Sequence, residues 1–78
     1  MKKPFLKTSW SKIEVGDVVL LAWPTGKKID VVEVEITKRA DDPILDEEQL
    51  VAVFFMRDGL VYGQTFSPDD PAYVQSRI

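Results

Sequence analysis

The clearest pattern along the chain is an alternation of apolar and polar residues over residues 29–39. Successive side chains of a strand point to opposite faces. This period of two therefore predicts one long antiparallel strand with Val32, Val34 and Ile36 toward the core. The preceding run, residues 17–23, is apolar at both sets of alternate positions and predicts a strand that is covered on both faces. The Pro-Thr-Gly-Lys segment between the two runs has the composition of a turn.

A second pattern predicts a tight hairpin in the second half of the chain. Two β-rich runs, VAVFFMR and LVYGQTF, flank Asp58-Gly59, a dipeptide that favours a two-residue type I′ turn. A two-residue loop fixes the register of both strands. The predicted pairs are Arg57 with Leu60, Phe55 with Tyr62, Val53 with Gln64 and Val51 with Phe66 on one face, and Met56 with Val61, Phe54 with Gly63 and Ala52 with Thr65 on the other.

The remaining segments are predicted as connections and one short strand. Residues 1–8 form an extended lead-in, and the Ser-x-x-Glu spacing of residues 11–14 matches a capping box that starts at most one helical turn. Residues 40–49 form an acidic connector with a short helical turn near its end. The prolines of residues 67–71 favour a single 3₁₀ turn, and residues 73–78 alternate again as a closing strand.

Several short strands without a convincing long helix indicate an all-β fold. A chain of 78 residues is one domain, which we place at residues 13–78 behind an N-terminal lead-in of residues 1–12. The tight hairpin and the 3₁₀ turn before the last strand resemble features of the SH3-like superfold. The resemblance implies a small five-stranded SH3-like barrel or a rolled antiparallel sheet, and it implies little about function.

The composition removes most catalytic chemistry. The chain has no cysteine and no histidine, so thiolate sites and the usual neutral-pH general base are absent. Acid–base catalysis needs carboxylates that converge on a cleft, whereas the adjacent carboxylates of this chain are neighbours on predicted loops. We therefore expect no enzyme activity, no cofactor and no metal site. The adjacent carboxylates are Asp41-Asp42, Asp46-Glu47-Glu48 and Asp69-Asp70.

The uneven charge keeps nucleic acid open as a second class of partner. The net charge is −3, made up of +3 in residues 1–39 and −6 in residues 40–78. Basic residues interleaved with aromatic ones are typical of nucleic-acid binding. The acidic second half opposes such binding, because phosphate affinity comes from lysine and arginine. The candidate contacts are Lys7, Trp10, Lys12, Lys27 and Lys28.

Residues 16–26, GDVVLLAWPTG, resemble the opening strand and loop of the MazF/PemK-type ribonuclease toxins. That family continues with an Arg-Pro pair that opens the next strand and supplies a catalytic arginine. This chain continues instead with Lys27-Lys28-Ile29-Asp30. The resemblance implies a degenerate toxin of this kind as a minor alternative.

The sequence shows neither a secretory leader nor an apolar run of membrane-spanning length. The opening MKKPFLKTSW has no apolar stretch behind its lysines, and the longest apolar run, VVLLAW, is the length of a strand. Together with the absence of cysteine, this predicts a cytoplasmic protein.

Both faces of the predicted hairpin are apolar, and this observation leads to the main functional hypothesis. The larger face, with Phe55 and Tyr62, is assigned to the core. The other face is expected to bind a partner through Phe54, Met56 and Val61, unless the N-terminal residues fold over it. The residues that would cover it are Phe5, Leu6 and Trp10.

The sequence thus predicts a non-enzymatic β-barrel interaction module that acts through protein–protein contacts. Its partner is either another protein or a second copy in a homo-oligomer. Size and composition are typical of a bacterial or phage accessory protein. The alternative is a nucleic-acid-associated accessory of transcription or translation that uses the basic N-terminal half.

Overall fold

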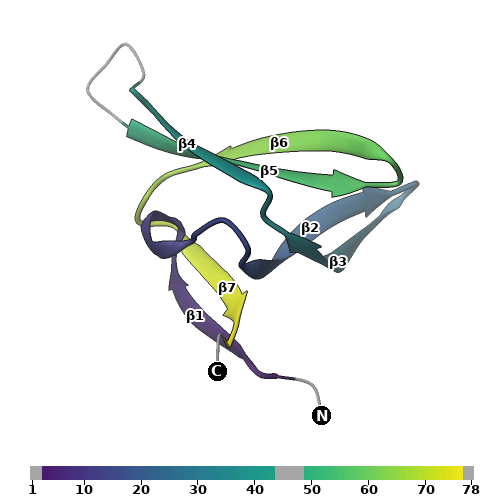
Figure 1. Ribbon diagram of the computed structural model, residues 1–78. Coiled ribbons are helices and arrows are strands. Elements are labelled where there is room, and N and C mark those ends of the chain that lie inside the picture. The colour runs from purple at the N-terminus through teal and green to yellow at the C-terminus, as the bar shows by residue number, and fades with distance from the viewer. Residues whose placement is uncertain (1–2, 44–48, 77–78) are drawn as a thin grey trace.

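The computed structural model describes residues 3–43 and 49–76 and shows an all-β fold (Figure 1). The described strands form two antiparallel sheets, one in the order β1-β7-β2-β3 and one in the order β4-β5-β6. The all-β prediction is confirmed. The elements are β1 (Phe5–Ser9), the 3₁₀ turn η1 (Trp10–Lys12), β2 (Val18–Thr25), β3 (Lys28–Glu35), β4 (Lys38–Pro43), β5 (Gln49–Arg57), β6 (Leu60–Phe66) and β7 (Pro71–Gln75).

The β5–β6 hairpin forms as predicted. Each of the seven predicted cross-strand pairs occurs in the structure, from Val51 opposite Phe66 to Arg57 opposite Leu60. The turn residues Asp58 and Gly59 have φ angles of 54° and 78°. Two consecutive positive φ angles are the signature of a type I′ turn, whose twist matches that of the strands it joins.

The prediction of one long strand over residues 29–39 is wrong, because the chain passes from one sheet to the other between Ile36 and Thr37. The Ile36 N–H donates to the Asp17 carbonyl at 2.8 Å, which continues the β2–β3 ladder. The next N–H, that of Thr37, donates to the Phe54 carbonyl at 2.8 Å and starts the pairing of β4 with β5. Two adjacent residues therefore bond to different sheets. The alternation of apolar and polar residues ends at Ile36, just before the chain enters the second sheet.

The segment predicted as an acidic connector begins as a strand. Residues 38–43 form β4, which pairs with β5 along its length. Alanine, aspartate and proline favour strands poorly, so this strand depends on its partner. The helical turn predicted near residues 46–49 falls largely on residues 44–48, outside the described part of the chain.

The N-terminal residues expected as a lead-in are built into the larger sheet. β1 pairs antiparallel with β7, from Phe5 opposite Gln75 to Ser9 opposite Pro71. The 3₁₀ turn lies directly after β1 and not before the last strand, which corrects the prediction. Before β7, Asp70 N–H donates to the Ser67 carbonyl at 3.0 Å, and this bond closes a simple β-turn.

The two sheets face each other across the core without closing into a barrel. Sheet edges lie at β1 and β3 in one sheet and at β4 and β6 in the other, and no described edge strand pairs across to the opposite sheet. The five-stranded barrel is therefore a wrong prediction, and the described residues contain seven strands. The prediction that residues 17–23 are covered on both faces also fails, since Ala22 is exposed.

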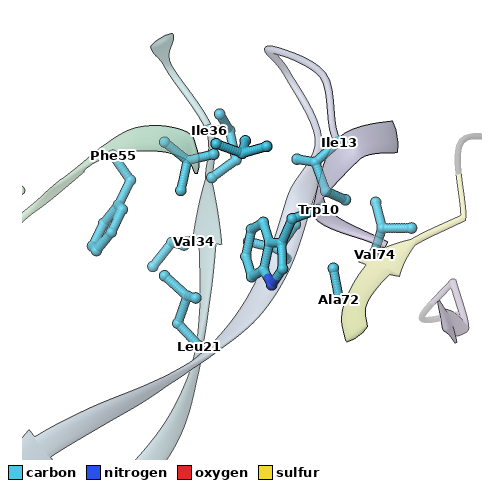
Figure 2. Packing of buried hydrophobic residues seen from close by; sticks show 11 residues of the cluster. Trp10, Ile13, Leu21, Val34, Ile36, Phe55, Ala72 and Val74 are labelled. Carbon is cyan, nitrogen blue, oxygen red and sulfur yellow. The ribbon is translucent and has the colours of Figure 1, made fainter. Parts of the chain in front are cut away.

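The core lies between the sheets and draws on both of them (Figure 2). Figure 2 shows Phe55 at one side of the cluster and Trp10, Ala72 and Val74 at the other, with Leu21 and Val34 between them. The expected core face of the hairpin is confirmed for Val51, Val53 and Phe55, which are buried, and for Tyr62 and Phe66, which pack against the core. Leu60, assigned to the same face, is 60% exposed beside the turn, so its assignment to the core is wrong. The buried hydrophobic residues are Trp10, Ile13, Val19, Leu21, Val34, Ile36, Val51, Ala52, Val53, Phe55, Ala72 and Val74.

One charged residue is buried among the described residues. Asp17 is 6% exposed, and its carboxylate Oδ2 accepts the Glu14 N–H at 2.8 Å. Its own N–H donates to the Glu14 carbonyl at 3.1 Å. The side chain thus closes the turn that carries the chain from η1 into β2.

Candidate partner-binding face

The candidate site is the outer face of the β4-β5-β6 sheet, the side that faces away from the core. Alternation along β5 turns Phe55 inward and its neighbours Phe54 and Met56 outward. Met56 is 58% exposed, and Val61, its cross-strand partner on β6, is 65% exposed. Phe54 lies two residues along the same face and is half-buried. The face brings together the three side chains that the sequence predicted as partner-binding.

Phe54 is held in place by a glycine on the neighbouring strand. Gly63 lies opposite Phe54, and a Cβ built on Gly63 would lie 2.8 Å from Cε1 and 2.9 Å from Cδ1 of the ring. No side chain larger than hydrogen fits beneath the ring, so the ring covers the bare backbone of β6. Lys38 Nζ lies 5.6 Å from the centre of the same ring, within the range of a cation–π contact. The ring is therefore positioned before any partner arrives.

Next to Phe54, the outer face carries small uncharged side chains. Alternation and register place Ala40, Ala52 and Thr65 side by side across the three strands. Ala52 is 5% exposed although it points outward, because it is small and lies between two neighbouring strands. Phe54, Met56 and Val61 thus protrude next to a row of small side chains, and Lys38 lies on the edge strand β4.

The described N-terminal residues do not cover this face. Trp10 stacks on Phe66 with ring centroids 3.9 Å apart, and Phe66 belongs to the core side of β6. β1 pairs with β7 in the other sheet, and Figure 1 shows this pair away from the β5–β6 turn. Met56 and Val61 are exposed in the folded chain, so covering by the lead-in, the alternative left open by the sequence, does not occur in the described structure.

On the inner side of the same hairpin, an aromatic cluster fastens the hairpin to the opposite sheet. Trp23 of β2 makes edge-to-face contacts with Phe55 at 5.7 Å and with Tyr62 at 4.8 Å. The Arg57 guanidinium lies 5.4 Å from the Trp23 ring, and its buried Nε has no hydrogen-bond partner in the described residues. These contacts fix the hairpin without using its outer face. The sequence did not point to Trp23 and Arg57, because their meeting depends on how the two hairpins pack.

The five candidate nucleic-acid contacts do not form one surface. Trp10 is 3% exposed, so its ring is not open to a base. Lys7 and Lys12 line the same shallow hollow beside β7. Lys27 and Lys28 lie at the far tip of the β2–β3 hairpin. That tip is about 20 Å along β2 from the residues beside β7, at the usual rise of a strand. The charge is therefore divided between two ends of the molecule.

The described carboxylates make local structural contacts. Arg39 and Asp41 form an ion pair at 3.2 Å. Asp70 Oδ2 accepts the Ser67 N–H at 3.3 Å within the turn before β7. Across the described residues, no three acidic side chains gather in the way a metal site requires. The group Asp46-Glu47-Glu48 lies outside the described part of the chain.

Comparisons with protein-family models, curated proteins and solved structures found no match to this chain. Within residues 3–43 and 49–76 there is no helix with the length and apolar character needed to cross a membrane.

Proposed function

We propose that this protein is a non-enzymatic, cytoplasmic interaction module that binds a protein partner through the outer face of the β4-β5-β6 sheet. The observation that carries the proposal is the exposure of Met56 and Val61, at 58% and 65%, beside the half-buried ring of Phe54. The inner face of the same hairpin already supplies the core. Folding therefore does not account for the exposed side chains of Met56 and Val61 on the outer face.

The physical properties of the face support a protein ligand. Phe54 is fixed by Gly63 and Lys38, so its burial against a partner costs little further side-chain entropy. Met56 is flexible and polarisable, and it adapts to an uneven apolar surface. Lys38 at the edge favours a partner that presents an acidic group next to its apolar anchor. The expected ligand is thus a protein surface with an apolar centre and a carboxylate at its rim.

The test substitutes side chains of this face and compares the variant with a matched double substitution on the other sheet. Phe54→Ser with Met56→Ser removes the proposed anchors, and Ile29→Ser with Val31→Ser removes two side chains of the other sheet that are 74% and 69% exposed. Both double variants should retain the circular dichroism of the wild type. Loss of a buried aromatic anchor commonly costs about 2 kcal/mol, which is about thirtyfold in affinity.

The measurement is affinity capture with tagged protein after nuclease treatment, followed by titration of the purified captured protein. The proposal expects binding by the wild type and the Ile29/Val31 variant, and at least a thirtyfold loss in the Phe54/Met56 variant. Equal binding by both variants would show that the partner does not bind this face. Binding that disappears with nuclease and falls steeply with salt would favour the nucleic-acid alternative. Unfolding of the Phe54/Met56 variant would show that this face serves the fold.

A further inference from the structure

Arg57 is a half-buried cation beside the turn of the β5–β6 hairpin. Its guanidinium lies 5.4 Å from the Trp23 ring of β2, and its buried Nε has no hydrogen-bond partner in the described residues. Within residues 3–43 and 49–76, no carboxylate forms an ion pair with Arg57, whereas Arg39 is paired with Asp41. A guanidinium carries five N–H donors. Arg57 therefore retains donors that no described residue uses.

The contact with Trp23 determines where these donors lie. Trp23 is itself held by edge-to-face contacts with Phe55 and Tyr62, at centroid distances of 5.7 Å and 4.8 Å. Tryptophan is the aromatic ring that attracts a cation most strongly. Because the planar fork of arginine is already rigid, a guanidinium held in this way loses little further freedom when it binds an anion. Arg57 is thus positioned before any ligand arrives.

A second cation lies on the same side of the opposite hairpin. Trp23 pairs with Asp30 of β3, so Lys28, two residues before Asp30, is on the same face as Trp23. Diagonal neighbours of this kind lie about 7–8 Å apart across two strands. Figure 1 shows the β2–β3 turn and the β5–β6 turn at the same end of the molecule. Lys28 and Arg57 therefore both lie near the Trp23 ring, one from each sheet.

The carboxylates at this end leave an excess of positive charge. Asp30 is on the same face as Trp23, but its Oδ2 accepts a hydrogen bond from Thr25 Oγ1 at 2.8 Å. Asp58 lies in the exposed β5–β6 turn. Arg57 and the two lysines of residues 27–28 outnumber these two carboxylates. This end of the molecule therefore favours an anion.

Leu60 supplies apolar surface beside the guanidinium. It lies directly opposite Arg57 in the hairpin, on the side that faces the core, yet it is 60% exposed. Tyr62 follows on the same side of β6, and its ring contacts Trp23. Side chains directly opposite each other have Cβ atoms about 4.5–5.5 Å apart. An anion bound to Arg57 could therefore place an attached apolar group on Leu60.

We propose that Arg57, Lys28 and Leu60 bind a carboxylate that carries an apolar group, between the β2–β3 turn and the β5–β6 turn. The Arg57 fork donates to the carboxylate oxygens, because its planar donors match a carboxylate in pairs. Lys28 adds positive charge, and the apolar group packs on Leu60. A small organic acid and the C-terminal residue of a peptide share this chemistry. The inference goes beyond the proposed function, since it concerns the core-facing side of the hairpin and not its outer face.

The test follows the side-chain N–H signals of Arg57 and Trp23 by nuclear magnetic resonance during titration with phenylacetate. Both signals should shift, because the guanidinium binds the carboxylate and lies against the indole ring. Phenylacetamide has the same shape without the charge and should bind at least about tenfold more weakly. Acetate, which lacks the apolar group, should also bind more weakly. Absence of a shift with phenylacetate overturns the proposal, as does equal binding of either control compound.

Variants test the residues without replacing the titration of the wild type. Arg57→Gln should bind phenylacetate at least about tenfold more weakly, and Arg57→Lys, which keeps the charge and loses the fork, should also bind more weakly than the wild type. Lys7→Gln is the matched control, since it removes the same charge from an exposed lysine of β1. Equal losses in Arg57→Gln and Lys7→Gln would indicate an effect of net charge and contradict the site. Loss of binding in Phe54→Ser with Met56→Ser would place the ligand on the outer face and contradict it as well.

Two peptides distinguish the possible sources of the carboxylate. Acetyl-alanyl-alanyl-leucine with a free C-terminus and its C-terminal amide differ in the carboxylate alone. Binding of the free peptide without binding of the amide supports the proposal and identifies a peptide C-terminus as a ligand. Binding of phenylacetate without binding of the free peptide supports it and identifies a small organic acid. Equal binding of the two peptides would show that the carboxylate is not recognised and would overturn the proposal.

Discussion

Alanine substitution of two neighbouring residues, Phe55 and Met56, separates the two faces of the β5–β6 hairpin. The Phe55 side chain is fully buried, and its ring contacts Trp23 at 5.7 Å and Tyr62 at 5.9 Å. Phe55→Ala leaves a cavity and removes both ring contacts, which together cost about 3–5 kcal/mol. A domain of this length has about 4–12 kcal/mol of stability in total. We therefore expect Phe55→Ala to lose a large part of its folded stability.

Met56→Ala should behave in the opposite way. More than half of this side chain is already in water, so the truncation removes about 1 kcal/mol or less of apolar burial. The assay is urea unfolding followed by tryptophan fluorescence, since Trp23 lies against Phe55 and reports on the hairpin. If Phe55→Ala does not fold, Phe55→Leu keeps most of the volume and allows the comparison at a smaller loss.

The stabilities of the Met56 and Phe55 variants can also refute the assignment of the two faces. A loss of stability in Met56→Ala that equals or exceeds the loss in the Phe55 variants would mean that the outer face belongs to the core. The partner-binding proposal would then lose its basis, because the exposure of Met56 carries it.

Three further predictions concern the turns and the absence of catalysis. Asp58→Ala with Gly59→Val should destabilise the fold by more than about 1 kcal/mol, because valine is strained at the positive φ of residue 59, and an unchanged melting temperature would contradict this. Asp17→Ala should lower the free energy of unfolding in urea by about 1–3 kcal/mol, since it leaves the part-buried Glu14 N–H without its acceptor. Asp17→Asn keeps an acceptor oxygen and should lower it less. Equal losses in the two variants would count against this role of Asp17. We expect no hydrolase or nuclease turnover with or without magnesium, and metal-dependent cleavage that disappears in Asp69→Asn with Asp70→Asn would show the non-enzymatic proposal to be wrong.

The elements that the sequence predicted well are those whose signals are local. The dipeptide Asp58-Gly59 determines the turn, the turn determines the register, and the register places Phe54 and Met56 on one face. The position of this face therefore depends on two local residues and not on the rest of the fold. The expectation that the face binds a partner stays a proposal, because exposure alone does not identify a ligand.

The elements that the sequence missed depend on contacts between distant segments. The alternation of apolar and polar residues ends at Ile36, but the polar residues that follow do not reveal that Thr37 bonds to β5. β4 contains two aspartates and a proline and forms because β5 offers it a partner. β1 likewise forms against β7, at the other end of the chain. In each case tertiary pairing outweighs local propensity.

The pairing of β1 with β7 also determines the order in which the two sheets can assemble. Sheet β4-β5-β6 is made of strands consecutive in the chain, so it needs only short loops to close. The other sheet requires β7 to insert between β1 and β2, and Phe5 to meet Gln75. Pairings of such large sequence separation form slowly. The smaller sheet can therefore form first during folding, and until β7 pairs, β1 and β2 lack the strand that joins them.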